Sequence, residues 1–395
     1  MVSQDMLRLG QQSSVIRAIS EYGAARRAQI GAENVFDFSL GNPSIPAPEA
    51  LTERLIRALQ EEHPCRVHGY TSSAGDMGTR GAVCEHIERT FGFEADPKLV
   101  YMTCGAAASL TVAFHALLLE GEKVVVPAPF FPEYRVFVEK AGGVLCPVPS
   151  LEPSFQIDLD AMAAAIDEKT KIVLLNSPNN PTGAVYSRET LEKLCALLRE
   201  KEKEYGTEIF LLADEPYREL CYGGASPAWL PSLYDRTLVA YSYSKSLSLP
   251  GERIGYLLVS PRMEKAAEVF AAVCGAGRSL GFVCAPSLWQ LVLKDCQGMT
   301  SDVSEYERNR DTLFHSLSEM GYTVTPPDGA FYLFVKSLEE DAGAFCERAK
   351  KYELLLVPSD SFGVKGYVRI AYCTDPETIE KSLPAFRALY EEYRK

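Results

Sequence analysis

The chain has 395 residues, of which 47% are hydrophobic and 24% are charged, and its formal net charge is −13 at pH 7. This composition is ordinary for a globular protein and excludes a fibrous or disordered chain, and a chain of this length buries roughly three quarters of its unfolded surface. The negative charge and the lack of any dense Lys/Arg block argue against nucleic acid and anionic membranes as partners.

The first predicted elements are helices. Apolar residues at helical spacing indicate a helix over residues 13–30, with Ser13 or Ser14 as its N-cap. The glycine and prolines of "VFDFSLGNPSIPAP" interrupt any regular element. The stretch "PEALTERLIRALQEE" then predicts the next helix, with Pro48 near its start.

Between about residues 100 and 260, short β-rich runs alternate with helical segments. Strands are predicted for "KLVYMT", "KVVVP", "KIVLLN", "EIFLLAD", "TLVAYS" and "IGYLLVS", and "SRETLEKLCALLREKEKEY" predicts a helix. This alternation is typical of an α/β domain whose mostly parallel sheet is covered by helices on both faces. Because ligands bind at the carboxyl ends of such strands, the residues that follow each strand are candidates for a site.

Beyond about residue 280 the pattern changes. Helical stretches surround "RNRDTLFHSLSEMGY", and the strand-like runs "GAFYLFVK" and "KGYVRIAYC" follow, separated by a helix. This predicts a smaller α+β domain. We therefore expect an N-terminal arm and helix over residues 1–40 that associate with the small domain, a large domain over 41–280, and a small C-terminal domain over 281–395.

Neither a membrane, a signal nor a metal-binding pattern is evident. No uninterrupted apolar run approaches the roughly 20 residues that span a bilayer, and residues 1–20 lack the apolar core of a signal peptide. The eleven cysteines are scattered without C-x-x-C spacing, and the five histidines lack other ligands nearby. We expect a cytoplasmic protein with reduced thiols, no structural metal and no membrane partner.

Five segments place polar residues directly after apolar strands: "TCGAAAS", "PAPFFPEY", "NSPNNPTG", "ADEPY" and "SYSKSLSLPGERIG". Asp214 is the most telling of these residues, because it follows the very apolar run "IFLLA". A carboxylate in such a place must be paired or hydrogen-bonded to stay charged, which implies a cationic partner.

The order of "NSPNNPTG", "DEPY", "SYSK" and "GERIG" resembles the class I and II aminotransferases, pyridoxal-phosphate enzymes of fold type I that are similar to aspartate aminotransferase. "GYTSSAG", "TCGAAAS", "PFFPEY", "SFG" and "YVRI" extend the resemblance, in family order, from about residue 37 to 372. It implies transfer of an amino group from an L-amino acid to a 2-oxo acid, with aspartate and 2-oxoglutarate as candidates. It also implies a homodimer with shared active sites.

The resemblance assigns the reacting groups. Lys245 resembles the lysine that holds the cofactor aldehyde as a Schiff base and then moves the substrate proton. A free lysine has a pKa near 10.4, so desolvation or nearby positive charge, to which Arg253 could contribute, has to lower it. Asp214 resembles the carboxylate that pairs with the pyridinium nitrogen, the alternative being a cap of the following turn. Asn180 and Tyr217 match the pair that hydrogen-bonds the cofactor's phenolate oxygen.

Other residues match the family's cofactor contacts. The phosphate ligands implied are the helix start at Gly105, Ala106 and Ala107, the hydroxyls of Ser242 and Ser244, and the guanidinium of Arg253. Tyr70 matches a tyrosine that the other subunit donates. Phe131 falls where relatives carry an aromatic that stacks on the cofactor ring, although a shift by one residue would place Phe130 there and leave Phe131 in the core.

Arg369 resembles the arginine that grips the substrate α-carboxylate, together with Asn180 and the backbone of Gly41. An arginine within an apolar strand is costly to bury unpaired, so its partner is either that carboxylate or one from the protein. Arg278, in "CGAGRSLGFVCAPS", is a candidate reader of a side-chain carboxylate near a subunit interface, or else forms a helix-terminal or interface salt bridge. The glycines around it do not fit G-x-G-x-x-G, so a dinucleotide fingerprint is rejected.

One motif departs from the family pattern. Where relatives commonly read P-G-x-x-F-G, this chain has "PSDSFG", with Ser359 in place of the glycine and a charge at Asp360. A different loop shape, and with it a different substrate pocket, is the expectation.

Two alternatives share some of these features. Pyridoxal-phosphate C–S β-lyases and other eliminating enzymes share nearly all the motifs and differ in how they treat a leaving group at Cβ. Regulators that use an aminotransferase-like domain as a sensor join it to an N-terminal DNA-binding domain. The motifs here begin near residue 37, which leaves no room for such a domain, and the net charge is wrong for DNA.

Overall fold

The computed structural model describes residues 2–11 and 15–394. Its largest element is an eight-stranded sheet in the order β2-β9-β8-β7-β6-β3-β4-β5. The strands are β2 (Val100–Thr103), β3 (Lys123–Ala128), β4 (Val144–Leu151), β5 (Gln156–Ile157), β6 (Thr170–Asn176), β7 (Phe210–Asp214), β8 (Thr237–Ser242) and β9 (Gly255–Val259). The six strand predictions between residues 98 and 260 are therefore confirmed.

The sheet is mostly parallel. β4, β3, β6, β7 and β8 pair in parallel, whereas β9 runs antiparallel to both β2 and β8, and β5 runs antiparallel to β4. These pairings confirm the α/β fold class. They also place the start of β9 at the same sheet edge as the carboxyl ends of β2 and β8.

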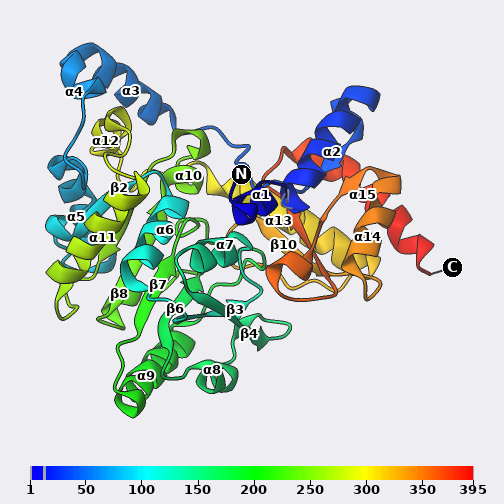
Figure 1. The fold of residues 1–395 in the computed structure, drawn as a ribbon. Coiled ribbons are helices and arrows are strands. Elements are labelled where there is room, and N and C mark those ends of the chain that lie inside the picture. Colours follow the sequence, from blue (N-terminus) through cyan, green and yellow to red (C-terminus); the bar gives the residue numbers. More distant parts are fainter. Residues whose placement is uncertain (1, 12–14, 395) are drawn as a thin grey trace.

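Helices cover both faces of this sheet (Figure 1). On one face lie α6 (Ala106–Leu117), α7 (Glu133–Lys140) and α11 (Ala266–Leu280). On the other lie α5 (Met77–Phe91), α8 (Leu159–Ala165), α9 (Arg188–Tyr205) and α12 (Ser287–Leu293), with α3 (Glu49–Glu61) and α4 (Pro64–His68) beyond them. Side chains alternate between the two cores: Leu211 and Ala213 of β7 pack in one, and Leu212 packs in the other.

A separate core lies in the C-terminal part of the chain. It is built on a three-stranded antiparallel sheet, in the order β10 (Tyr332–Lys336), β13 (Tyr367–Ala371) and β12 (Val357–Pro358). The helices that pack on it are α13 (Val303–Met320), α14 (Ala342–Ala349) and α15 (Pro376–Glu392). The strands predicted for residues 329–336 and 365–373 are thus confirmed.

The N-terminal helices contact both of these parts. α2 (Val15–Ile30) packs Ile19 against Leu355 and Val357, and β1 (Phe36–Asp37) pairs in parallel with β11 (Leu354–Leu355). α1 (Gln4–Gln11) reaches α7, where Asp5 pairs with Lys140. Residues 13 and 14, at the start of the predicted helix, lie outside the described residues.

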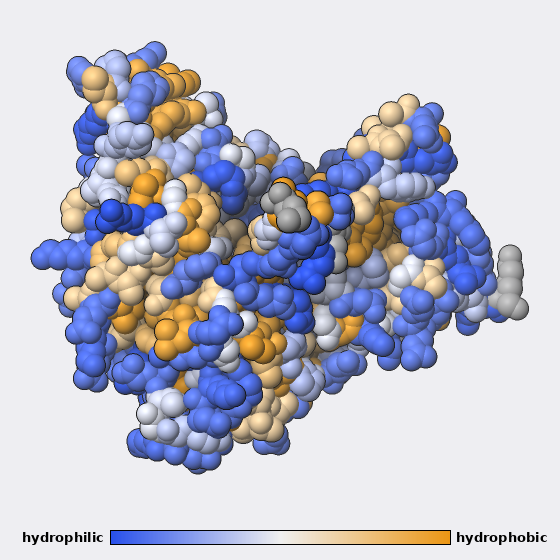
Figure 2. Space-filling view, in the orientation of Figure 1, coloured by the Kyte–Doolittle hydropathy of each residue, from blue (hydrophilic) through white to orange (hydrophobic). Residues whose placement is uncertain are grey.

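The surface is hollowed between two projections, one formed by α3 and α4 and the other by α2 (Figure 2). The α3 projection exposes apolar side chains, among them Ile56 and Leu59, which are 50% and 52% exposed. Within residues 2–11 and 15–394, no helix has the length and apolar composition needed to cross a membrane.

Candidate active site

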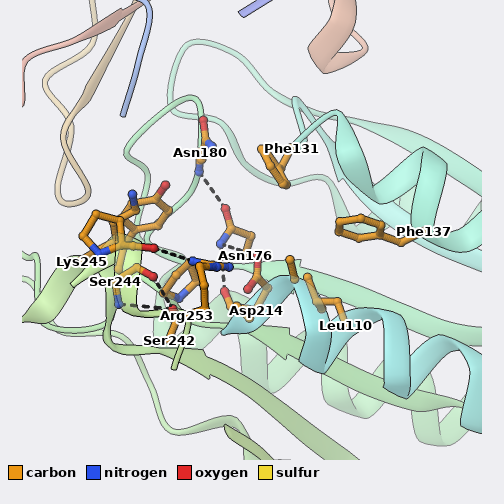
Figure 3. A pocket seen from close by; sticks show the side chains of 15 residues that line it. Leu110, Phe131, Phe137, Asn176, Asn180, Asp214, Ser242, Ser244, Lys245 and Arg253 are labelled. Atoms are coloured by element: carbon orange, nitrogen blue, oxygen red, sulfur yellow. Dashed lines mark hydrogen bonds between the residues drawn. The ribbon is translucent and has the colours of Figure 1, made fainter. Parts of the chain in front are cut away.

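A cavity opens at the carboxyl ends of the central strands. Its walls come from the start of α6, the segments after β3, β6 and β7, the short helix α10 (Tyr243–Ser246) after β8, and the turn before β9. Figure 3 shows Lys245, Ser244 and Arg253 grouped on one side and Phe131 with Phe137 on the other. The predicted site residues that line the cavity are Ala106, Ala107, Phe131, Asn180, Asp214, Tyr217, Ser242, Ser244, Lys245 and Arg253.

Lys245 lies on α10, three residues after the end of β8. Its Nζ donates to the carbonyl oxygen of Gly41 at 2.7 Å. The pKa of Lys245 is lowered from 10.5 to about 8, mainly by burial and also by the positive charges of Arg253 and Arg369, whereas the Cys373 thiol opposes this change. More of this amine is therefore uncharged near neutral pH than in a free lysine, and that form is able to accept a proton.

Asp214 is the last residue of β7, and it is buried. Its Oδ2 accepts a hydrogen bond from the Tyr134 hydroxyl at 2.5 Å, and Asn176 Nδ2 donates to its backbone carbonyl at 2.9 Å. Burial raises the pKa of Asp214 to about 7, although the hydrogen bond from Tyr134 opposes this rise. The carboxylate is thus fixed through one oxygen only.

The other carboxylate oxygen, Asp214 Oδ1, is buried and has no partner among the described residues. None of the described cations forms an ion pair with Asp214 either. A buried carboxylate oxygen without a donor is costly, and a protonated ring nitrogen in the cavity would satisfy it. The predicted cationic partner must therefore come from a bound molecule, and the site fits a pyridinium group.

The opposite end of the cavity is suited to an anion. Gly105 caps α6 with a φ of 88°, and the side chains of Ser242 and Ser244 hydrogen-bond to each other at 2.8 Å. Arg253 Nη1 donates to the Pro250 carbonyl at 2.8 Å, which holds the guanidinium in place. A Cβ on Gly105 would lie 3.0 Å from Arg253 Nη2, so the glycine keeps the space in front of the guanidinium open. Free helix N–H groups, two hydroxyls and one guanidinium form a cradle of the kind that binds phosphate.

Arg369 lies on β13 and is 2% exposed. Its Nη1 donates to Asn180 Oδ1 at 3.1 Å and its Nη2 to the Ser39 carbonyl at 2.6 Å, whereas its Nε has no partner within the described chain. No carboxylate of the described residues pairs with it. An ion pair with a protein carboxylate, one of the two alternatives that the sequence left open, is therefore not formed by the described residues, and the contact with a substrate carboxylate stays a prediction.

The structure distinguishes the two adjacent phenylalanines. Phe130 is 2% exposed and packs in the core, whereas Phe131 lines the cavity and contacts the ring of Tyr134 with its centroid 5.5 Å away. The side chain at 131 therefore has the position from which a ring could stack on a ligand. That stacking stays a prediction.

Tyr70 and Arg278 do not line the cavity of this chain. Tyr70 is 98% exposed, and Arg278 is exposed near the end of α11. A contact between either residue and the site would need a second copy of the chain. Gly41 lies at the cavity through its carbonyl oxygen, which accepts the hydrogen bond from Lys245.

The departure at "PSDSFG" has a defined structure. Ser359 begins a 3-10 turn, Ser359–Phe362, and its buried hydroxyl accepts a hydrogen bond from the Tyr367 backbone N–H at 3.1 Å. Asp360 is exposed. The serine therefore ties this turn to β13, two residues before Arg369.

Asn176 lines the cavity and was not predicted, and neither were Tyr134 and Tyr332, which hydrogen-bond to the cavity residues Asp214 and Tyr217. The other lining residues that were not predicted are Leu110, Phe137, Pro216 and Pro250. Asn176 and Tyr134 both lie in segments that the motifs quoted above include. For Asn176, the end of an apolar strand was an available signal, whereas Tyr134 lies on α7. Tyr332 lies in the apolar run "GAFYLFVK", where only the fold reveals that its hydroxyl lies 3.0 Å from that of Tyr217.

Comparisons with known proteins agree with this geometry. A sequence profile of the family described as aminotransferase class I and II matches residues 33–386. The chain is 30% identical over 373 residues to a probable aspartate aminotransferase of Methanocaldococcus jannaschii, with 92% of this chain and 95% of that protein covered.

Two solved structures are similar over nearly the whole chain. A crystal structure of an amino transferase from Eubacterium rectale is 50% identical with a TM-score of 0.98 and covers 100% of both chains. Aspartate aminotransferase from Thermus thermophilus with maleate is 28% identical with a TM-score of 0.86, covering 98% of this chain and 99% of that one.

Proposed function

The chain belongs to the class I and II aminotransferase family and is a pyridoxal-phosphate-dependent aminotransferase, and we propose that the cavity described above is its active site, with aspartate as amino donor and 2-oxoglutarate as acceptor. The observation that carries this assignment is the unpartnered Oδ1 of Asp214 beside Lys245 in one cavity. The choice of substrates is supported by the names of similar proteins, which include aspartate aminotransferases.

The residues of the cavity fit the cofactor group by group. Asp214 Oδ1 would accept the ring N–H, and Asn180 and Tyr217 would donate to the phenolic oxygen. Phe131 would lie against the ring. The phosphate ligands would be Gly105, Ala106, Ala107, Ser242, Ser244 and Arg253. When bound, pyridoxal phosphate supplies an aldehyde for the amino group and a ring that withdraws electrons from the reacting carbon.

Lys245 performs the proton transfers. Its amine has a pKa lowered to about 8, so that part of it is uncharged near neutral pH. In that form it accepts the proton from the substrate Cα at Nζ and returns it to the neighbouring carbon. The same nitrogen is then available for the reverse steps with the oxo acid. The carbonyl of Gly41, 2.7 Å from Nζ, holds the amine at the mouth of the cavity.

Arg369, with Asn180 and the backbone of Gly41, would hold the substrate α-carboxylate, because its Nε is unpartnered. We further propose that Arg278 of a second copy reads the side-chain carboxylate of aspartate. The support for this proposal is that Arg278 is exposed in the last turn of α11 and does not line the cavity of its own chain.

A homodimer with shared active sites is part of this proposal. Its support is the 98% exposure of Tyr70, whose counterpart in the family belongs to the other subunit, and the apolar side chains exposed on α3.

We propose the cytoplasm as the compartment of the protein, since the eleven unpaired cysteines suit a reducing environment. We also propose the domain limits 1–40, 41–280 and 281–395, with the N-terminal arm and helix on the small domain.

The function is tested with a panel of L-amino acids against 2-oxoglutarate, using the purified protein with pyridoxal phosphate. Aspartate is expected to give oxaloacetate and glutamate at the highest rate, and Lys245→Ala protein serves as the control for uncatalysed exchange. In parallel, cystathionine is supplied and pyruvate and thiol are assayed. Release of thiol without amino transfer would contradict the proposal and favour a C–S β-lyase.

Two arginine variants separate the recognition of the two carboxylates. Arg369→Ala is expected to lower kcat/KM for aspartate and for alanine alike, by roughly 10- to 150-fold, since a charge-assisted hydrogen-bond pair contributes about 1.5–3 kcal/mol. Arg278→Ala is expected to lower kcat/KM for aspartate and to leave that for alanine unchanged. If the Arg278 variant loses both activities equally, Arg278 does not read the side chain.

A further inference from the structure

Tyr332 lies where three groups of the site meet. It is the first residue of β10 and is 2% exposed, so its side chain belongs to the C-terminal core rather than to the large sheet. Its hydroxyl oxygen lies 3.0 Å from that of Tyr217, which comes from the segment after β7. The two rings meet edge to face with centroids 5.8 Å apart, so the pair has one defined geometry.

The ring of Tyr332 also contacts Arg369. The guanidinium carbon of Arg369 lies 4.6 Å from the Tyr332 ring centroid and 5.2 Å from that of Phe362. Since Arg369 forms no ion pair with a described carboxylate, these rings and the acceptors on Asn180 and Ser39 are what hold it. A cation over an aromatic face is attracted to the ring, so Tyr332 supports Arg369 from one side.

The third contact is with the backbone of Gly41. A Cβ built on Gly41 would lie 2.0 Å from the Tyr332 hydroxyl oxygen, so that hydroxyl occupies the space beside the residue whose carbonyl accepts the hydrogen bond from Lys245. Phe331, the residue before Tyr332, has its ring 5.5 Å from Lys245 Nζ. Phe331 and Tyr332, at the start of β10, thus contact Lys245, Arg369 and Tyr217 between them.

From these contacts we propose that Tyr332 is a positioning residue that joins the carboxylate-binding Arg369 to Tyr217 and makes Tyr217 a stronger donor to the cofactor's phenolic oxygen. This inference rests on the proposed roles of Tyr217 and Arg369. The physical basis is cooperativity: a hydroxyl that accepts one hydrogen bond donates a stronger one, and the nearby positive charge of Arg369 favours donation by Tyr332.

The direction of the hydrogen bond follows from the site. If Tyr217 donates to the cofactor, its oxygen is left to accept, and Tyr332 must be the donor. Burial raises the pKa of Tyr217 well above its usual value and that of Tyr332 to about 12, so both remain protonated and able to donate at neutral pH. The charged and titratable side chains that act on this pair are Arg369 on both tyrosines, Asp214 on Tyr217 and Cys373 on Tyr332.

The test measures the pH at which the visible absorbance of the holoenzyme titrates. Tyr332→Phe keeps the ring against Arg369 and removes only the hydroxyl. Without the Tyr332 hydroxyl, Tyr217 stabilises the deprotonated phenolic oxygen of the cofactor less strongly. The titration midpoint is therefore expected to rise by about 0.3 to 1 pH unit, which corresponds to the free energy of one neutral hydrogen bond. An unchanged midpoint would overturn the proposal.

The double variant Tyr332→Phe, Tyr217→Phe tests whether Tyr332 acts through Tyr217. The single variant Tyr217→Phe is expected to raise the midpoint more than Tyr332→Phe does, and adding Tyr332→Phe to it is expected to produce no further shift. Tyr322→Phe is the matched control, since this buried hydroxyl donates to the Phe386 carbonyl at 2.9 Å in the same core. Additive shifts, or an equal shift in the control, would show a general effect on folding instead.

The ring is tested separately with Tyr332→Leu. Loss of the aromatic face under Arg369 is expected to weaken binding of 2-oxoglutarate by about 2- to 30-fold relative to Tyr332→Phe. Equal dissociation constants for the two variants would contradict the role of the ring. Failure of the proposed function can be told apart from failure of the Tyr332 proposal. If the proposed function is wrong, the wild-type protein shows no visible band, or the Lys245→Ala protein retains the same lysine adduct.

Discussion

Replacement of Lys245 by alanine is expected to lower transamination by about 100- to 10,000-fold, the range that a positioned general acid and base contributes. The variant loses the only amine among the described residues that line the cavity, and with it the group whose pKa of about 8 allows a proton to be accepted and returned near neutral pH. The measurement is the steady-state rate of amino transfer from aspartate at saturating cofactor.

A chemical readout accompanies the rate. Borohydride reduction of the wild-type holoenzyme is expected to fix the cofactor on residue 245, which peptide mass analysis locates. Lys98→Ala, in which an exposed lysine is removed, is the control and should leave both the rate and the adduct unchanged. A Lys245→Ala protein that still gives the same reducible lysine adduct would refute the assignment.

The second large effect is expected for Asp214→Asn. This change keeps the shape of the side chain and its contact with Tyr134 but removes the negative charge that would pair with the cofactor ring. Loss of one partner of a buried ion pair costs about 3–5 kcal/mol, so kcat/KM should fall between about 100-fold and several thousand-fold. Substrate binding through Arg369 should change little, since that residue lies on β13 and is held by Asn180 and Ser39.

Asp214 is also expected to make the stability of the cofactor-free protein depend on pH. Burial raises the pKa of Asp214 from 3.8 to about 7, so the folded state binds more protons than the unfolded state between these values. The stability contributed by the protonated carboxyl is present below pH 3.8 and is lost as the pH rises through 7. The loss amounts to about 4 kcal/mol.

Thermal unfolding of the cofactor-free protein at pH 5 and at pH 8 measures this loss of stability. Between pH 5 and pH 8 the wild type is expected to lose more stability than Asp214→Asn, because at pH 8 the wild type carries a buried charge without a partner. Asp235→Asn, at an exposed position, is the control for the loss of one charge. If the wild type and Asp214→Asn change in parallel with pH, the carboxyl is already ionised and paired in the protein without cofactor.

Much of the large sheet could be predicted because its strands are short runs of apolar, β-branched residues between clear breaks. What the runs could not give was the order β2-β9-β8-β7-β6-β3-β4-β5 or the reversed direction of β9. Strand order depends on contacts between segments far apart in the chain, and the local pattern of apolar residues carries no information about such contacts. The reversal of β9 is what brings Arg253 to the same edge as Gly105.

For the site, residues within ordered family motifs could be predicted, whereas their supports could not. Asp214 and Lys245 lie in recognisable motifs at or just after the end of a strand. Tyr332, by contrast, lies in an apolar run, where a tyrosine is expected to be an ordinary core residue. Tyr134 likewise lies on α7, and its role is visible only from its hydrogen bond to Asp214. A hydroxyl buried in a core is informative only once its partner is known.

The close approach of Tyr332 to Gly41 has a consequence for how this protein can vary. Because a methyl group on residue 41 would overlap the tyrosine hydroxyl, the two positions share one volume that only one of them can fill. Among descendants of this chain, a larger residue at 41 should appear only together with the loss of the hydroxyl at 332. Residues nearly three hundred positions apart in the sequence should therefore change as a pair.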